Sequence, residues 1–193
     1  ALESTELNRV DKAIGKLEGV SLFIDECKDS SLRYLLNKIR QYVITKDVKF
    51  VLVDYLQLVK GSGTSREQEV AMVARELKNL AKELNITIVA LSQLSRGVER
   101  RDGCRPTLSD LRESGEIEQA SDIVMLVYRP EYYGIMTDDS GRSTEGLVDL
   151  IFAKGRNIGT GTLPLKFKKE YTKFIDPQDY TEKYISAQPS ESF

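Results

Sequence analysis

The sequence predicts an α/β fold in which a mainly parallel sheet is flanked by helices and carries an antiparallel flank on its C-terminal side. Short, almost wholly apolar segments of strand length alternate with amphipathic helix patterns in the first half of the chain. Apolar residues on both faces of a strand indicate a sheet covered on both sides, and this alternation is typical of parallel strands joined by crossover helices. The last third has strand patterns separated by polar turns, which indicates antiparallel pairing.

The predicted elements follow from hydrophobic spacing and from capping residues. Apolar residues at three- and four-residue steps indicate helices, and Ser65 with Gln68 is predicted to form a capping box. In order, the first half gives a helix from Ser4 that ends before Gly19, the strand Val20–Ile24, a helix opening at Ser30 or Ser31, the strand Phe50–Val53, a helix from Ser65 to Leu84 and the strand Ile86–Leu91. The last third gives strands at Ile123–Tyr128 and Leu147–Ala153 and a hairpin of Thr162–Phe167 with Lys173–Ile175.

Length and composition limit the class of protein. The chain has 193 residues, of which 40% are hydrophobic and 30% charged, and this suits one domain with a buried core. The chain has no histidine, which excludes both acid–base catalysis by histidine and metal ligation by histidine. Its two cysteines are far apart in the sequence, which disfavours a zinc site or a disulfide framework. This cysteine usage fits a reducing cytosol, so we expect a cytoplasmic protein. No apolar run approaches the ~20 residues that a membrane span needs. With a net charge of −2, any nucleic-acid contact needs a local basic patch.

Two polar side chains follow neighbouring strands of the predicted parallel sheet. In open α/β sheets, ligands bind beyond the carboxyl ends of the strands. Asp54 follows Phe50–Val53 and is suited to holding Mg²⁺ through water, although it would equally serve to cap the next turn. Gln93 follows the next strand, where a neutral amide can sense a γ-phosphate or orient water; the alternative is a polar residue at a strand exit.

Two cations end a strand in the last third. Lys154 and Arg156 are two residues apart, so in an extended chain their side chains point to the same side. They are suited to reaching the phosphates of a nucleotide on a neighbouring subunit, because a guanidinium offers charge and a planar donor fork. The alternative is a solvated basic turn.

The stretch 105–116 is a candidate DNA-binding loop. Arg112 and the backbone N–H groups around Gly115 are suited to gripping phosphodiesters without reading bases. Glu113 and two further glutamates oppose a purely electrostatic DNA patch, whereas four arginines nearby supply positive charge. The alternative is a surface loop with local ion pairs. The arginines are Arg96, Arg100, Arg101 and Arg105, and the two further glutamates are Glu116 and Glu118.

Four motifs occur in order along the chain: Val53–Leu58, Glu76–Asn85, Ala90–Arg96, and Ser109–Gly115 with Ile117–Gln119. Taken together, they strongly resemble the C-terminal motor domain of DnaB-type replicative DNA helicases. The resemblance covers most of the chain, from the segment that ends at Asp25 to the strand end Lys154–Asn157 and the hairpin after it.

The resemblance implies a fold, an activity and partners. Residues 1–185 are expected to form a RecA-like ATPase domain that is truncated on its N-terminal side, followed by a disordered tail at 186–193. The family uses ATP and Mg²⁺, assembles as a homohexamer around single-stranded DNA, moves 5′→3′ and unwinds duplexes. Primase and a helicase loader are the implied protein partners, without a membrane partner.

The resemblance also implies roles for individual residues. Asp54 matches the Walker B aspartate near Mg²⁺, and Gln93 matches the sensor that links the γ-phosphate to the DNA-binding loops. Lys154 and Arg156 match the pair inserted across the subunit interface, with Arg156 as the arginine finger. The loop that lines the ring channel is matched by Arg112, Glu113 and Gly115.

The chain departs from the family pattern at Ala120–Ser121 without loss of a named functional side chain, and in two ways that bear on the site. No G-x-x-x-x-G-K-[ST] phosphate loop is present, and the family carries that loop and its catalytic glutamate upstream, so residues 1–193 alone are expected to be inactive. Ile158 stands where the family has glycine, which is expected to bear on the pose of Arg156. Two other functions stay open at this point: a non-catalytic module that binds a ring, a loader or a primase, and another RecA-like ATPase such as a recombinase.

Overall fold

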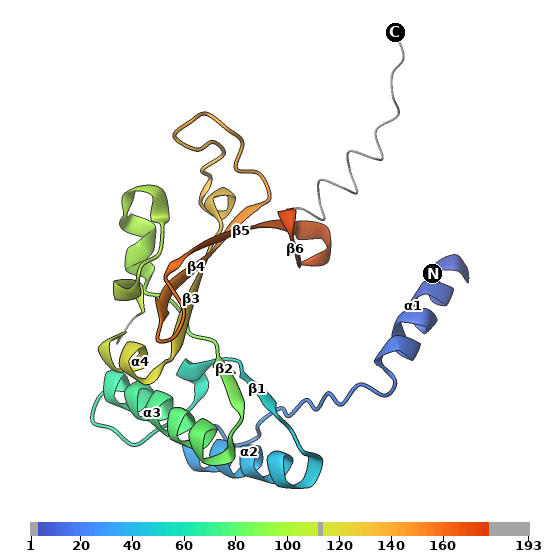
Figure 1. The fold of residues 1–193 in the computed structure, drawn as a ribbon, viewed down its shortest axis with the longest axis vertical. Helices are drawn as coiled ribbons and strands as arrows, with labels where there is room; N and C mark the ends of the chain where they lie inside the picture. Colours follow the sequence, from blue (N-terminus) through green and yellow to red (C-terminus); the bar gives the residue numbers. More distant parts are fainter. Residues whose placement is uncertain (1–3, 112–113, 178–193) are drawn as a thin grey trace.

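The computed structural model describes residues 4–111 and 114–177, which include four α-helices, a two-stranded sheet and a four-stranded sheet (Figure 1). The helices are α1 (Ser4–Leu17), α2 (Leu32–Lys46), α3 (Arg66–Leu84) and α4 (Ser114–Ala120). The strands are β1 (Phe50–Val53), β2 (Thr87–Ala90), β3 (Ile123–Tyr128), β4 (Leu147–Gly155), β5 (Gly161–Lys168) and β6 (Lys173–Ile175).

Both predicted kinds of strand pairing are present. β1 and β2 are parallel, with Val53 opposite Ala90, and α3 is the crossover between them. The last four strands form an antiparallel sheet in the order β3-β4-β5-β6. The parallel layer is the smaller of the two, whereas the sequence predicted a mainly parallel sheet.

The prediction of a strand at Val20–Ile24 is wrong for the structure described. This segment forms no strand pairing within residues 4–111 and 114–177, and Leu22 and Ile24 are 66% and 83% exposed. A strand needs a neighbouring edge to satisfy its backbone, and this segment has none beside it. The helix before it, α1, stands away from the rest of the fold, and its apolar Leu17 is 64% exposed (Figure 1).

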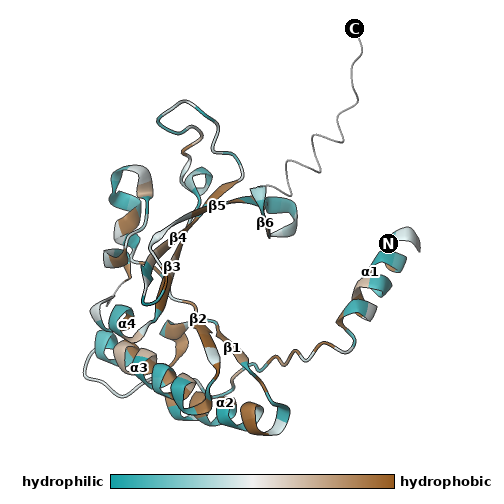
Figure 2. Ribbon diagram, in the orientation of Figure 1, coloured by the Kyte–Doolittle hydropathy of each residue, from teal (hydrophilic) through white to brown (hydrophobic). Residues whose placement is uncertain are grey.

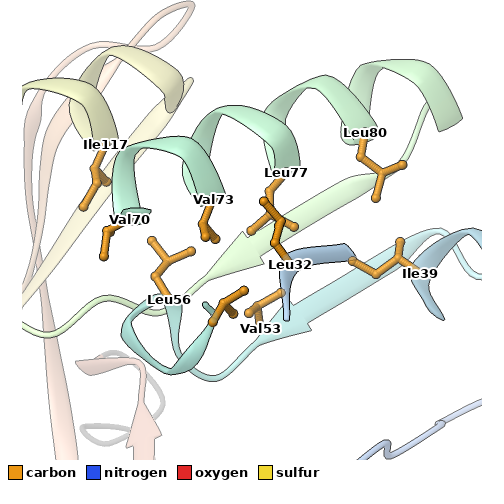
Figure 3. Packing of buried hydrophobic residues seen from close by; sticks show 10 residues of the cluster. Leu32, Ile39, Val53, Leu56, Val70, Val73, Leu77, Leu80 and Ile117 are labelled. Atoms are coloured by element: carbon orange, nitrogen blue, oxygen red, sulfur yellow. The ribbon is translucent and has the colours of Figure 1, made fainter. Parts of the chain in front are cut away.

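The main core lies between α2, α3 and the parallel strands. Val70 and Val73 of α3 are fully buried, and Ile117 of α4 packs into the same cluster (Figure 3). In Figure 2 the strands are mainly hydrophobic, while α3 has one hydrophilic and one hydrophobic side. This amphipathic pattern is the physical reason that α3 covers β1 and β2.

The N-terminal caps of α2 and α3 largely match those predicted from the sequence. The Ser31 hydroxyl accepts from the Tyr34 N–H at 3.3 Å, so Ser31 rather than Ser30 caps α2. The Ser65 hydroxyl accepts from the Gln68 N–H at 3.3 Å, but the Gln68 amide oxygen accepts from the Thr64 N–H at 3.1 Å. Half of the predicted capping box therefore forms.

Two further features concern the described residues only. None of their helices is both long and apolar enough to cross a membrane. Cys27 and Cys104 are free thiols.

Candidate functional site

The structure brings Asp54 and Gln93 to the same edge of the parallel sheet. Asp54 directly follows β1 and Gln93 lies three residues beyond β2, and both side chains are exposed. Because β1 and β2 are adjacent and parallel, their carboxyl ends meet at one edge, where α/β folds bind ligands.

Gln57 connects the two strand ends and was missed by sequence reasoning. Its Nε2 donates to the Ser92 Oγ at 3.0 Å, and its Oε1 accepts from the Gln93 N–H at 3.3 Å. The neighbouring Leu56, which is only 3% exposed, donates its N–H to the Leu91 carbonyl at 2.9 Å. Gln57 lies within the motif Val53–Leu58, but no role for it was predicted from the sequence. This link fixes the Gln93 backbone relative to the turn that carries Asp54.

The donor set at this edge fits a water-mediated magnesium ion. Asp54 offers an exposed carboxylate, and Mg²⁺ prefers oxygen ligands and keeps much of its hydration shell. Among residues 4–111 and 114–177, no group of three or more acidic or cysteine side chains is placed to hold a metal directly. A single carboxylate that acts through water needs no such group.

Lys154 and Arg156 lie together against the connection between α4 and β3. The Lys154 ammonium donates to the Glu118 carbonyl in α4. The Arg156 N–H donates to the Asp122 carbonyl at 2.9 Å, and its Nη1 lies 3.5 Å from the Asp122 Oδ1. Arg156 remains 58% exposed, so its guanidinium faces solvent rather than the core.

Gly155 lies between these two cations in the sequence, and its backbone packs closely against Ile158. A Cβ at this position would lie 2.5 Å from the Ile158 carbonyl oxygen and also against the Ile158 side chain. Such a contact forces something to shift, so glycine is required for the tight turn that follows β4. Ile158, the residue that departs from the family pattern, therefore forms the wall of the turn that holds Arg156.

The candidate DNA loop is described only at its two ends. Arg112 and Glu113 lie outside the described residues, while Gly115 is in the first turn of α4 with open space around its Cα. Two contacts hold α4 in place. Ile117 is buried in the main core at 5% exposure, and the Glu116 Oε2 lies 3.8 Å from the Arg75 Nη2 of α3.

Two of the four nearby arginines form local ion pairs. The Arg101 guanidinium donates from Nη1 and Nη2 to the two carboxylate oxygens of Asp110, each at 2.8 Å. The Arg105 Nη1 lies 2.5 Å from the Asp149 Oδ2. The alternative of local ion pairs is therefore correct for these two side chains. The Arg101 guanidinium holds the pKa of the Asp110 carboxyl below its ordinary value against the opposing effect of burial. Thr107 adds to this by donating its N–H to Asp110 at 2.7 Å.

Comparison with known proteins assigns the chain to a family. Residues 1–176 match the model of the DnaB-like helicase C terminal domain. The replicative DNA helicase DnaC of Bacillus subtilis (strain 168) is 41% identical over 178 residues, which are 91% of this chain and 38% of that protein. The replicative DNA helicase DnaB of Geobacillus stearothermophilus is 39% identical over 178 residues, with the same shares. The chain thus spans about two fifths of the length of these relatives.

Solved structures show the same fold. A structure of a DnaB-like replicative helicase, described with its interactions with primase, matches with a TM-score of 0.79 and 36% identity, over 91% of this chain and 42% of that one. A second solved structure, of an isolated ATPase domain, matches with the same TM-score and identity, over 91% of this chain and 61% of that one. These matches confirm the RecA-like α/β class that the sequence predicted. The chain belongs to the DnaB-like helicase C-terminal domain family.

Proposed function

We propose that this chain is part of a hexameric replicative DNA helicase that couples ATP hydrolysis to 5′→3′ movement on single-stranded DNA and to duplex unwinding. The observation that carries the proposal is the edge where Asp54 and Gln93 follow two adjacent parallel strands, in a chain of this family. An exposed carboxylate and an exposed amide at one edge of a parallel sheet suit magnesium and a γ-phosphate.

Each residue of this edge has a proposed role. Asp54 is the Walker B aspartate and would hold Mg²⁺ through water. The ion, when bound, neutralises charge that develops on the phosphates. Gln93 contacts the γ-phosphate, and Gln57 keeps the Gln93 backbone in register with the Asp54 turn. A change at the phosphate is thereby passed to the segment after β2.

Arg156 is the proposed arginine finger and acts on the nucleotide of a neighbouring subunit. Its guanidinium is exposed, and its backbone is anchored by the hydrogen bond to Asp122. Lys154 lies beside it but donates to Glu118, so it serves mainly to hold the strand end against α4. A site completed by a neighbour makes hydrolysis depend on ring geometry.

The loop with Arg112, Glu113 and Gly115 is proposed to line the ring channel. Contact with phosphates alone suits a motor that must pass any base sequence. Primase and a helicase loader are the proposed partners, and a relative of known structure is described with its interactions with primase. The cytoplasm is the proposed location, because relatives such as the Bacillus subtilis and Geobacillus stearothermophilus proteins are replicative DNA helicases of bacteria, whose DNA lies in the cytoplasm.

One observation favours a second function. The 193 residues contain no G-x-x-x-x-G-K-[ST] motif, so by themselves they lack the cradle for the β- and γ-phosphates. A non-catalytic module that docks on a helicase ring, loader or primase would need no such cradle.

Activity assays separate the two functions. We expect the full-length protein to hydrolyse ATP when stimulated by single-stranded DNA and to unwind a fork with a 5′ tail, whereas residues 1–193 alone do neither. Magnesium-dependent turnover and fork unwinding are the measurements. A full-length protein that binds a ring, loader or primase without hydrolysing ATP would support the docking module instead.

Removal of the Arg112 guanidinium tests the DNA loop. We expect Arg112→Ala in the full-length protein to weaken binding of oligo-dT, oligo-dA and mixed single strands by similar factors, because phosphate contacts carry no sequence information. Fluorescence anisotropy at several salt concentrations measures this and should give a shallower salt dependence. An effect confined to one base composition would contradict a backbone contact.

A further inference from the structure

Asp122 divides its carboxylate between two cations from different parts of the fold. Its Oδ2 contacts the Lys78 ammonium of α3, and its Oδ1 lies 3.5 Å from the Arg156 Nη1. Its backbone carbonyl accepts from the Arg156 N–H at 2.9 Å. Asp122 thus touches both the backbone and the side chain of the arginine at the strand end.

The packing of α3 holds Lys78 in a fixed position beside Asp122. Its side chain is only 19% exposed, whereas those of Asp122 and Arg156 are 51% and 58% exposed. The flanking Leu77 and Leu80 of α3 are buried in the main core, so the backbone that carries Lys78 is held by packing. Hydrogen bonding from Lys78 lowers the pKa of the Asp122 carboxyl against the opposing effect of burial, and the charge of the nearby Arg156 guanidinium lowers it further.

The contact with Arg156 is loose by comparison. At 3.5 Å between two side chains that are more than half exposed, the ion pair contributes little to stability. It still narrows the positions that the guanidinium can occupy, and a phosphate can replace it without disturbing the backbone hydrogen bond. This is the behaviour expected of a residue that directs an arginine toward a ligand.

Asp122 also lies between the end of α4 and the strand end that carries Arg156. α4 follows that loop, begins at Ser114 and ends at Ala120, just before Asp122. The Lys154 ammonium donates to Glu118 in the same helix. A shift of α4 when the loop meets DNA would therefore act on the position of Arg156 through Asp122.

We propose that Asp122 is a positioning residue for Arg156, holding the guanidinium in the orientation that reaches a neighbour's nucleotide and linking it to α4. This inference rests on the proposed helicase function. Asp122 acts through Arg156 and contacts no nucleotide itself. Its loss therefore lowers the rate of hydrolysis without weakening the binding of ATP or DNA.

The test uses Asp122→Asn in the full-length protein, with Asp138→Asn as the matched control. Asp138 pairs with Arg142 at 2.9 Å and lies in a loop between β3 and β4, so its substitution removes the same charge and the same kind of ion pair. We expect Asp122→Asn to lower the DNA-stimulated kcat by roughly 10-fold, with KM for ATP and the Kd for oligo-dT within about twofold of the control. Asp122→Glu, which keeps the charge, is expected to recover most of the loss.

The outcomes are distinct. Turnover of Asp122→Asn equal to that of Asp138→Asn, while Arg156→Ala is impaired, overturns this inference and leaves the proposed function standing. The inference is also overturned if Asp122→Asn lowers both turnover and the melting temperature and Asp122→Glu does not recover the turnover. If Asp122→Asn does not assemble, Asp122→Ser removes the same charge and is held to the same criteria. A wild-type protein without DNA-stimulated hydrolysis, or an unimpaired Arg156→Ala variant, overturns both proposals.

Discussion

Replacement of Arg156 by alanine in the full-length protein is expected to lower DNA-stimulated ATP hydrolysis by about 10³-fold or more. A guanidinium inserted from a neighbour stabilises charge on the transferring phosphoryl group, and Arg156 is exposed at this strand end whereas Lys154 is partly buried. Lys154 cannot substitute for it, because its ammonium donates to the Glu118 carbonyl. The measurement is steady-state hydrolysis with saturating single-stranded DNA.

Folding of the Arg156→Ala variant is expected to be unaffected. The side chain is 58% exposed, and the backbone hydrogen bond to Asp122 is kept by alanine. Circular dichroism and size-exclusion chromatography check the fold and the assembly. Arg142→Ala is the matched control, because Arg142 is 79% exposed and also pairs with an aspartate. Equal turnover of the two variants would remove the arginine-finger assignment.

Replacement of Asp110 by alanine is expected to lower the free energy of unfolding of the chain by about 2–3 kcal/mol. Asp110 is only 4% exposed, and its carboxylate accepts from both ends of the Arg101 guanidinium and from Thr107. Its own carbonyl accepts from the Ser95 N–H at 2.7 Å. Loss of the carboxylate leaves the Thr107 N–H without its acceptor and loosens the turn that leads toward the candidate DNA loop.

Urea unfolding followed by circular dichroism measures this effect. Glu83→Ala is the control, because Glu83 also accepts from both ends of an arginine guanidinium, that of Arg40, but its side chain is 53% exposed. We expect no measurable loss of stability in the control, since exposed pairs are screened by water and salt. Equal destabilisation of both variants would show that burial does not matter at Asp110.

The contribution of Asp110 is expected to depend on pH in a definite direction. The pKa of Asp110 is lowered in the folded chain, while in the unfolded chain it has its ordinary value of about 3.9. The unfolded state therefore binds the proton first, and the stabilisation is full above about pH 5 and is lost as pH falls through the lowered pKa. Urea midpoints of wild type and Asp110→Ala should converge under acid conditions. A difference between the two urea midpoints that stays constant below the lowered pKa of Asp110 would contradict stabilisation by the Asp110–Arg101 ion pair.

Local patterns predicted most elements of the fold closely. The run Phe50–Val53 is β1 to the residue, and the predicted strand Ile86–Leu91 contains β2, Thr87–Ala90. Ser65 caps α3 as expected because its hydroxyl and the N–H that it accepts from are three residues apart. Such features depend on neighbours within one or two helical turns, and these are visible in the sequence.

Val20–Ile24 shows where this kind of inference fails. Its β-rich, apolar pattern indicates a strand, yet strand formation requires a partner edge that the pattern does not contain. The same holds for the site. Asp54 and Gln93 could be predicted because parallel strands end at one edge, whereas Gln57 could not, since its partner Ser92 is 35 residues away.

Periodicity and capping chemistry were therefore sufficient to establish the α/β class, the helices, most strands and the residues that end them, because these depend on short-range sterics and hydrogen bonds. Packing alone settled that Asp110 is buried with Arg101 and that Asp122 lies between Lys78 and Arg156. The latter contact joins Lys78 to a residue 44 positions along the chain. Interactions over such separations exist only once the chain has folded, because the hydrophobic core sets which polar side chains meet.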